Sequence, residues 1–207
     1  KIKVIVTLKN GVLDPQGKAI QQTLNGMNFD NVKEVRQGKF FEIEVKEANE
    51  VKAKSLAEEG FLVYIPDIYS RLKPNIVLNY DQIGFKKGIE YKEALGWDLP
   101  VMDVVSCASL LKLDYTVSCI GFCYGGSLSW LVAQKSFILD TSVCYYGSSI
   151  PDYLERDINC PTLVHFGKED IGIPQDSVKN VIDFAKKQNF EVFVCEYENA
   201  DHGFNCD

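Results

Sequence analysis

The chain reads Gly121-Phe122-Cys123-Tyr124-Gly125-Gly126 between an apolar run and a segment rich in small residues. The pattern of glycine, any residue, nucleophile, any residue and glycine is typical of a tight turn from a buried strand into a helix. We expect a strained backbone at Cys123, and a β-carbon at Gly121 or Gly125 to strike the neighbouring strand or helix. The N-terminus of the following helix favours a thiolate. Cys123 is therefore a candidate nucleophile, and a packed thiol in a glycine-rich turn is the alternative.

Short apolar runs alternate with helical patterns on both sides of this turn. The expected strands are residues 61–65, 116–120, 142–146, 162–166 and 190–197. The expected helices are residues 99–112, 125–133 and 176–187, and the polar stretch 81–93 leads into the first of them. Strands that alternate with helices predict an α/β fold with a mostly parallel, doubly wound sheet.

Two polar residues follow the last two of these strands. Asp170 comes just after the first of the two strands, and His202 comes just after the second. Nucleophile, acid and histidine occur in this order along the chain of α/β-hydrolases. The order predicts Cys123 as nucleophile, His202 as base and Asp170 as the acid that orients the imidazole. We expect the backbone N–H of Tyr124 to donate a hydrogen bond to the oxyanion of the tetrahedral intermediate.

Other polar and sulfur-containing residues have simpler interpretations. Glu169 is an alternative acid, but a solvated loop carboxylate is the favoured interpretation, and His165 is expected to be a core histidine. Five cysteines lie in apolar elements and are expected to be packing thiols: Cys107, Cys119, Cys144, Cys160 and Cys195. The sequence contains no C-x-x-C, G-x-G-x-x-G or P-loop pattern. We therefore expect neither a metal site nor a cofactor.

The 207 residues carry a net charge of −7, and the acidic excess lies after residue 54. Residues 1–54 contain ten Lys or Arg and seven Asp or Glu, whereas residues 55–207 contain twelve and twenty-two. An acidic surface repels phosphate, so we expect no nucleic-acid partner for the larger part. No apolar run approaches the roughly 18 residues of a membrane span, so no membrane partner is expected. Seven cysteines without a signal segment predict reduced thiols in a cytoplasmic protein.

The first part of the chain follows a different pattern. Residues 2–8 alternate as a half-buried strand, Asp14 and Pro15 fit the start of a helix, and residues 32–45 return as one or two strands. Over residues 1–52 the chain resembles PurS, mainly in Gly11-Val12-Leu13-Asp14-Pro15-Gln16-Gly17 and Val35-Arg36-Gln37-Gly38-Lys39. PurS is the small, non-catalytic subunit of phosphoribosylformylglycinamidine synthase in purine biosynthesis. The resemblance implies a small β-α-β unit that associates with itself or with the other purine-synthesis subunits.

A second resemblance covers about residues 54–207. It rests on Leu56-Ala57-Glu58-Glu59-Gly60, Pro66-Asp67-Ile68-Tyr69-Ser70-Arg71, the turn at Cys123, Tyr145-Tyr146-Gly147 and His202-Gly203-Phe204. These stretches resemble the dienelactone hydrolase family. The resemblance implies hydrolysis of a small lactone or enol ester by a Cys-His-Asp triad, through an acyl-thioester intermediate. It also implies that Arg71 helps to bind a substrate carboxylate.

Two domains are therefore predicted, residues 1–52 and residues 53–207. We expect the second to be a partial α/β-hydrolase domain. The family begins with strands that have no match in residues 1–52, and it continues beyond His202 into a helix that covers the sheet. The alternative to an ester hydrolase is a PurS-like non-catalytic subunit.

Overall fold

The computed structural model describes residues 2–7, 18, 38–43, 56–74, 76–79 and 81–205. The chain divides into two compact units, residues 1–63 and residues 64–207. The predicted boundary near residue 52 falls within residues 44–55, which lie outside the described part, and it stays a prediction.

The first unit contains a pair of antiparallel strands. Strand β1 (Ile2–Thr7) pairs with β2 (Gly38–Ile43), so that Val4 lies opposite Phe41. Both strands lie where the alternating pattern predicts them. The helix expected after Pro15 lies outside the described residues, apart from helical Lys18.

A helical turn at residues 56–58 ends at Gly60. Gly60 has a φ of 91°, and its N–H donates to the carbonyl of Ala57 at 3.1 Å. The next N–H, of Phe61, donates to the carbonyl of Leu56 at 3.1 Å. This pair of bonds is the common way for a helical turn to stop at a glycine with positive φ.

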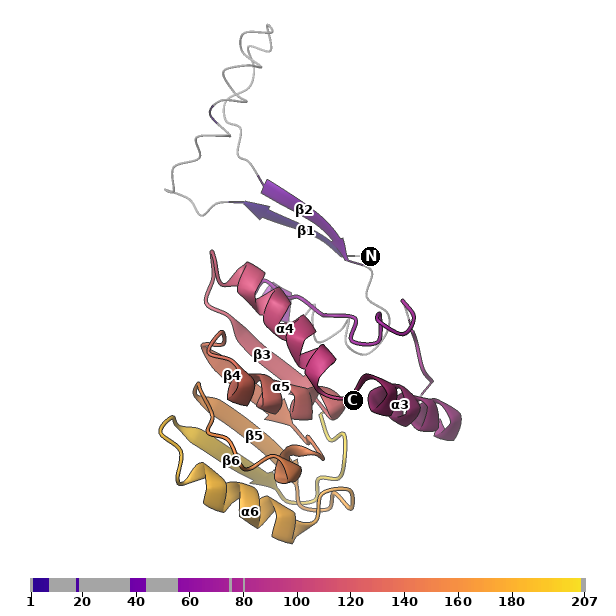
Figure 1. Ribbon diagram of the computed structural model, residues 1–207, viewed down its shortest axis with the longest axis vertical. Helices are drawn as coiled ribbons and strands as arrows, with labels where there is room; N and C mark the ends of the chain where they lie inside the picture. The colour runs from indigo at the N-terminus through magenta and orange to yellow at the C-terminus, as the bar shows by residue number, and fades with distance from the viewer. Residues whose placement is uncertain are drawn as a thin grey trace, which may run out of the picture. The chain divides into compact units, whose positions relative to one another are not determined.

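The second unit is built on a four-stranded parallel sheet in the order β3-β4-β5-β6 (Figure 1). The strands are β3 (Ser118–Phe122), β4 (Thr141–Tyr145), β5 (Thr162–Gly167) and β6 (Val192–Tyr197). All four match predicted strands, with ends that differ by a few residues. The parallel pairing sets Phe122 beside Tyr145, Tyr145 beside His165, and His165 beside Cys195.

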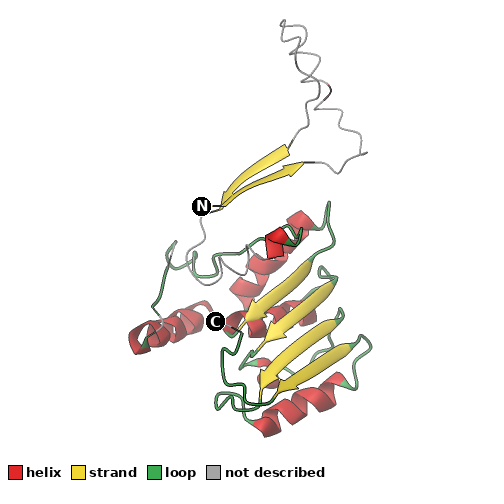
Figure 2. Cartoon of the chain, turned by 180° about the vertical axis from the view of Figure 1, so that it is seen from behind, coloured by secondary structure: helices red, strands yellow, loops and turns green. Residues whose placement is uncertain are grey.

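The helix before β3 and the helices after β3, β4 and β5 lie on one face of the sheet, as the two opposite views show (Figures 1 and 2). They are α4 (Asp98–Leu111), α5 (Tyr124–Lys135), the short 3-10 helix η1 (Ile150–Asp152) and α6 (Gln175–Ala185). Right-handed crossovers that advance in one direction along a sheet bring their helices to the same face. The predicted parallel α/β fold is confirmed.

The core of this unit lies between the sheet and these helices. Helix α5 is its centre, because Trp130, Leu131 and Val132 are almost completely buried. Strand β5 adds Val164 and Phe166, which are fully buried. The strand β3 and the N-terminus of α5 are thereby held firmly, and the turn between them has little freedom to move.

Two segments differ from the sequence prediction. Residues 61–65 have no regular secondary structure, so the strand predicted there is wrong. An apolar run becomes a strand only if a neighbour completes its hydrogen-bond ladder, and the four-stranded sheet ends at β3. The side chain of Phe61 is 64% exposed.

The polar stretch that begins at Asp81 forms a helix, α3 (Gln82–Leu95), that was not predicted. The Asp81 side chain caps it by accepting the N–H of Gly84 at 2.7 Å. Gly96, at a φ of 62°, ends it. Two internal glycines and the lack of a clear apolar stripe hide this helix from a reading of periodicity.

No single helix of the described residues is long and apolar enough to cross a membrane. Helices α3 and α4 reach that length and composition only as a pair, and they are bent by 83° at their junction.

Candidate active site

Cys123 lies in the turn between β3 and α5, where the sequence places it. Its backbone has a φ of 53° and a ψ of −113°, a conformation that side chains other than glycine rarely adopt. The turn is held on both sides, because the Cys123 N–H donates to the carbonyl of Tyr145 and its carbonyl accepts the N–H of Ser127. The predicted strain is present, and it fixes the direction of the thiol.

The glycine pattern around Cys123 is partly different from the prediction. A β-carbon at Gly121 would lie 1.9 Å from the carbonyl oxygen of Gly125, as expected of a position that only glycine can fill. At Gly125 itself a β-carbon would meet nothing within 4 Å, so the expected clash there is wrong. The tight position is Gly126, whose β-carbon would lie 2.3 Å from the Tyr145 carbonyl oxygen. The reason is that Gly126 faces β4, whereas Gly125 faces open space.

The three side chains of the predicted triad are brought together. His202 Nε2 lies 3.0 Å from Cys123 Sγ, and His202 Nδ1 lies 2.7 Å from Asp170 Oδ2. The Asp170 side chain is completely buried, and its other oxygen accepts the N–H of Gly172 at 2.9 Å. The carboxylate is thus held by one backbone donor and holds the imidazole in turn.

The surroundings of His202 stabilise its protonated form. They raise its pKa to about 9, and the largest cause is the hydrogen bond with Cys123. Burial opposes this increase, and the hydrogen bond and charge of Asp170 add to it. A positive imidazolium between a sulfur and a carboxylate is the arrangement that supports a thiolate nucleophile.

Tyr146 is a further residue of the site that the sequence analysis left without a role. It is fully buried at a φ of 36°, and its N–H donates to the carbonyl of His165 at 2.8 Å. The Tyr146 ring lies 5.2 Å from the His202 ring and 5.3 Å from the Phe204 ring. Tyr146 therefore forms a rigid wall against the imidazole. Its place directly after a buried strand was the available signal.

Tyr124 places both its backbone and its ring at the site. Because it is the first residue of α5, its N–H has no carbonyl partner within the helix and points out of the helix N-terminus. Its ring is stacked with that of Tyr69 at 6.2 Å and lies 5.1 Å from Trp97. Burial, and then Tyr69, raise the Tyr124 pKa to about 12. No local sequence pattern marks Tyr69 and Trp97, because only tertiary packing brings these rings to Tyr124.

Arg71 is engaged with another side chain. Its Nε and an Nη donate to the two carboxylate oxygens of Asp103 at 2.8 and 2.7 Å. This bidentate ion pair uses the face of the guanidinium with which arginine usually grips a carboxylate. The substrate-binding role implied for Arg71 stays a prediction.

Glu169, His165 and the cysteines other than Cys123 lie outside the predicted triad. Glu169 is exposed, as expected of a loop carboxylate. His165 is buried, stacked on Tyr145 at 4.2 Å, and its Nδ1 lies 2.8 Å from the Tyr197 hydroxyl, so it is a core histidine. Burial lowers its pKa. The cysteines of the described part are all free thiols, of which Cys144 and Cys160 are buried.

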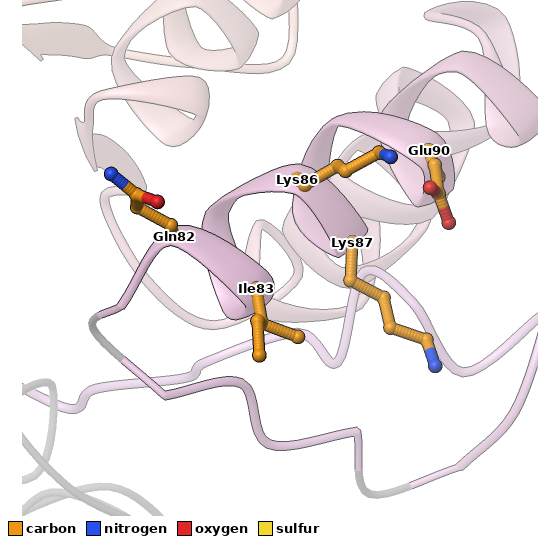
Figure 3. Close-up of a pocket in the computed structure, with 5 residues that line it drawn as sticks. All are labelled: Gln82, Ile83, Lys86, Lys87 and Glu90. Carbon is orange, nitrogen blue, oxygen red and sulfur yellow. The ribbon is translucent and has the colours of Figure 1, made fainter.

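A cavity of about 540 Å³ lies on helix α3 (Figure 3). It is lined by Gln82, Ile83, Lys86, Lys87 and Glu90. None of these residues belongs to the predicted triad. Within the described residues, no group of three or more His, Cys, Asp and Glu side chains could hold a metal ion.

A parallel sheet with a strained turn at a cysteine after β3, an aspartate after β5 and a histidine after β6 is typical of the α/β-hydrolase fold. The chain belongs to the dienelactone hydrolase family, whose model matches residues 40–207. Residues 1–60 match the model of PurS, phosphoribosylformylglycinamidine (FGAM) synthase. Both resemblances drawn from the sequence are confirmed.

Individual relatives agree with this assignment. A Salmonella typhimurium protein, provisionally named carboxymethylenebutenolidase, is 30% identical over an alignment of 167 residues, and the match covers 74% of this chain and 61% of the relative. The carboxymethylenebutenolidase of Pseudomonas putida is 28% identical over 156 residues, 72% of this chain and 65% of that protein. The chain thus spans less than two thirds of the length of these relatives.

A crystal structure from Klebsiella pneumoniae, provisionally identified as a dienelactone hydrolase, superposes with a TM-score of 0.66 at 27% identity. The superposition covers 79% of this chain and 72% of that one. The phosphotriesterase P91 from metagenomic libraries shares the fold, with a TM-score of 0.61 at 21% identity.

Proposed function

We propose that this chain is a thiol-dependent carboxylic ester hydrolase, with Cys123 as nucleophile, His202 as base and Asp170 as orienting acid. The observation that carries the proposal is the position of the His202 ring, 3.0 Å from the Cys123 sulfur and 2.7 Å from the Asp170 carboxylate. These are the distances at which a base can take the proton of a nucleophile while a third group fixes its tautomer.

In the first half of the reaction, His202 Nε2 takes the thiol proton and the Cys123 sulfur attacks the ester carbonyl carbon. The carbonyl oxygen becomes an oxyanion, to which the Tyr124 N–H donates a hydrogen bond at the positive end of α5. When the oxyanion collapses, the carbon–oxygen bond of the ester breaks. The leaving oxygen receives the proton from His202, and the acyl group remains on Cys123 as a thioester.

In the second half, His202 is neutral again and takes a proton from a water molecule. The hydroxide attacks the thioester, and the carbon–sulfur bond breaks to return the thiolate and release a carboxylic acid. Asp170 supports each cationic stage of His202, because its buried carboxylate lies against Nδ1 throughout.

The substrate class we propose is a small lactone or enol ester. An enolate is a good leaving group, and a thiol nucleophile needs one, because a thiolate is itself expelled readily from the tetrahedral intermediate. Membership of the dienelactone hydrolase family and the names of the relatives support this choice.

The test compares the wild type with Cys123→Ala and His202→Ala on a dienelactone and on an activated aryl ester. Both variants are expected to lose at least about 10³-fold in kcat, as triad residues of acyl-transfer enzymes do. Circular dichroism melts check that each variant is folded. Equal rates in three folded proteins would eliminate the proposal.

A second candidate function rests on the PurS match over residues 1–60. We infer that this segment is an interaction unit, which associates with itself or with the synthetase and glutaminase subunits of purine synthesis. Co-purification with those subunits, unchanged by Cys123→Ala, is the expected result. Failure of the full chain to bind either subunit or itself would remove this candidate.

A further inference from the structure

Lys92 is a half-buried cation on helix α3 that has no carboxylate partner among the described residues. Its ammonium donates a hydrogen bond of 3.3 Å to the hydroxyl of Ser149. It also lies 5.0 Å from the centre of the Trp97 ring and 5.9 Å from that of the Tyr124 ring. The positive charge is thus held by one neutral hydroxyl and two ring faces.

Several other cations of the same unit pair with carboxylates. Arg71 pairs with Asp103, Lys112 with Asp140 and Lys135 with Asp98. A partly buried charge without a counter-ion is unfavourable, and ring faces recover only part of the lost solvation. The surroundings of Lys92 therefore favour an anion that the protein itself does not provide.

The contacts of Lys92 lead directly to the nucleophile turn. Tyr124, whose ring faces the ammonium, is the residue after Cys123. Ser149 donates its N–H to the hydroxyl of Ser127 at 3.1 Å, and Ser127 donates its N–H to the carbonyl of Cys123 at 3.1 Å. An anion bound by Lys92 would therefore lie beside the turn that holds the proposed nucleophile.

Tyr124 supplies a second group with unused hydrogen-bonding capacity. Its hydroxyl is buried and has no hydrogen-bond partner within the described part of the chain. The raised pKa of Tyr124 keeps this hydroxyl protonated, so that it remains able to donate. A buried donor without a partner is costly unless a ligand satisfies it.

We propose that Lys92 is the specificity-determining residue that binds a carboxylate on the acyl part of the ester substrate, with the ring of Tyr124 beside it. This inference rests on the proposed hydrolase function and assigns the substrate a charge. It gives Lys92 the role that the family resemblance implied for Arg71, whose guanidinium is occupied by Asp103.

The test uses two activated esters that differ in one group, p-nitrophenyl hydrogen adipate and p-nitrophenyl hexanoate. The full chain is compared with Lys92→Met, and with Lys87→Met as a matched control, because Lys87 is an exposed lysine on the same helix. Lys92→Met is expected to lower kcat/KM for the adipate ester by about 10- to 100-fold, the usual cost of a charge-assisted hydrogen bond. The hexanoate ester should change less than about twofold.

Two further variants test whether the loss of activity on the adipate ester comes from the charge of Lys92. Lys92→Arg keeps the charge and should recover most of the activity on the adipate ester, which a purely structural role of the side chain does not predict. Arg71→Met should affect the two esters equally. Selective loss on the adipate ester in Arg71→Met but not in Lys92→Met would overturn the inference, as would an equal loss on both esters in Lys92→Met.

The two proposals fail in different ways. If the wild type hydrolyses hexanoate and Cys123→Ala does not, but Lys92→Met leaves the preference for adipate unchanged, only the role of Lys92 is wrong. If Cys123→Ala hydrolyses both esters as fast as the wild type, the hydrolase function fails, and the inference about Lys92 fails with it.

Discussion

His202 Nε2 lies 3.0 Å from Cys123 Sγ, although the two residues are separated by 79 positions along the chain. The contact joins the loop after β6 to the turn after β3. These two strands are the opposite edge strands of the four-stranded sheet. It is also the largest cause of the raised pKa of His202. This one contact therefore links the fold, the electrostatics and the proposed chemistry.

The pKa values of the two histidines of the chain should be shifted in opposite directions from the usual value. His202 is expected to have a pKa of about 9, whereas burial holds the pKa of His165 below its usual 6.5. In Cys123→Ala the pKa of His202 should fall, because the largest cause of its increase is removed. Imidazole signals of ¹⁵N-labelled protein, followed by NMR from pH 5 to 10, measure both groups. A His202 pKa near 6.5 in the wild type would contradict the prediction.

The raised pKa of His202 also predicts how stability depends on pH. A histidine whose pKa is higher in the folded state stabilises the fold fully below its unfolded pKa of about 6.5, and loses that contribution as the pH rises through about 9. The wild type should therefore lose more free energy of unfolding between pH 6 and pH 9.5 than His202→Ala does. Urea denaturation at the two pH values measures this difference. Parallel losses in the two proteins would show that the folded-state pKa of His202 is not raised.

Asp170 and Glu169 form a natural pair for testing the acid of the triad. Asp170→Asn should lower kcat by about 10⁴-fold, because the amide favours the wrong tautomer of His202. Glu169→Gln should change kcat less than about twofold, since that carboxylate is exposed. Steady-state rates on an activated ester measure both. The reverse order of effects would identify Glu169 as the acid.

The glycines of the nucleophile turn should differ in their tolerance of alanine. Gly126→Ala places a β-carbon 2.3 Å from the Tyr145 carbonyl oxygen and should lower the free energy of unfolding by about 1–3 kcal/mol. Gly125→Ala meets nothing within 4 Å and should be neutral, or stabilise α5 by up to about 1 kcal/mol. Chemical denaturation of the two variants decides between them. Equal destabilisation would show that the turn does not have the described backbone.

Several elements could be predicted from local patterns alone. Strands β3 to β6 and helices α4 to α6 are found where apolar runs and helical spacing indicate them. Helix α3 was missed because Gly84 and Gly88 weaken its pattern, and the decisive signal is the cap made by Asp81. The run 61–65 was predicted as a strand because it is apolar, but a strand also needs a paired neighbour, which no local pattern reports.

The proximity of Cys123, His202 and Asp170 could be predicted from their order along the chain, whereas the surroundings of these three residues could not. The tight fit of Gly126 against β4, the wall made by Tyr146 and the ion pair between Arg71 and Asp103 all depend on contacts between distant segments. The same is true of Lys92, an ordinary lysine in a polar stretch until α3 brings it over Trp97.

The amino-acid order alone settled which segments alternate as strand and helix, which residue stands in the strained turn, and which acid and histidine follow the last two strands. These are local properties, since periodicity, glycine spacing and position after a strand can each be read over a few residues. Only the packed structure decided which side chains are in contact, that Arg71 pairs with a carboxylate, and that Gly126 leaves no room for a β-carbon. The register of β3 to β6 sets those distances, and register is a relation between segments that no single stretch of sequence contains.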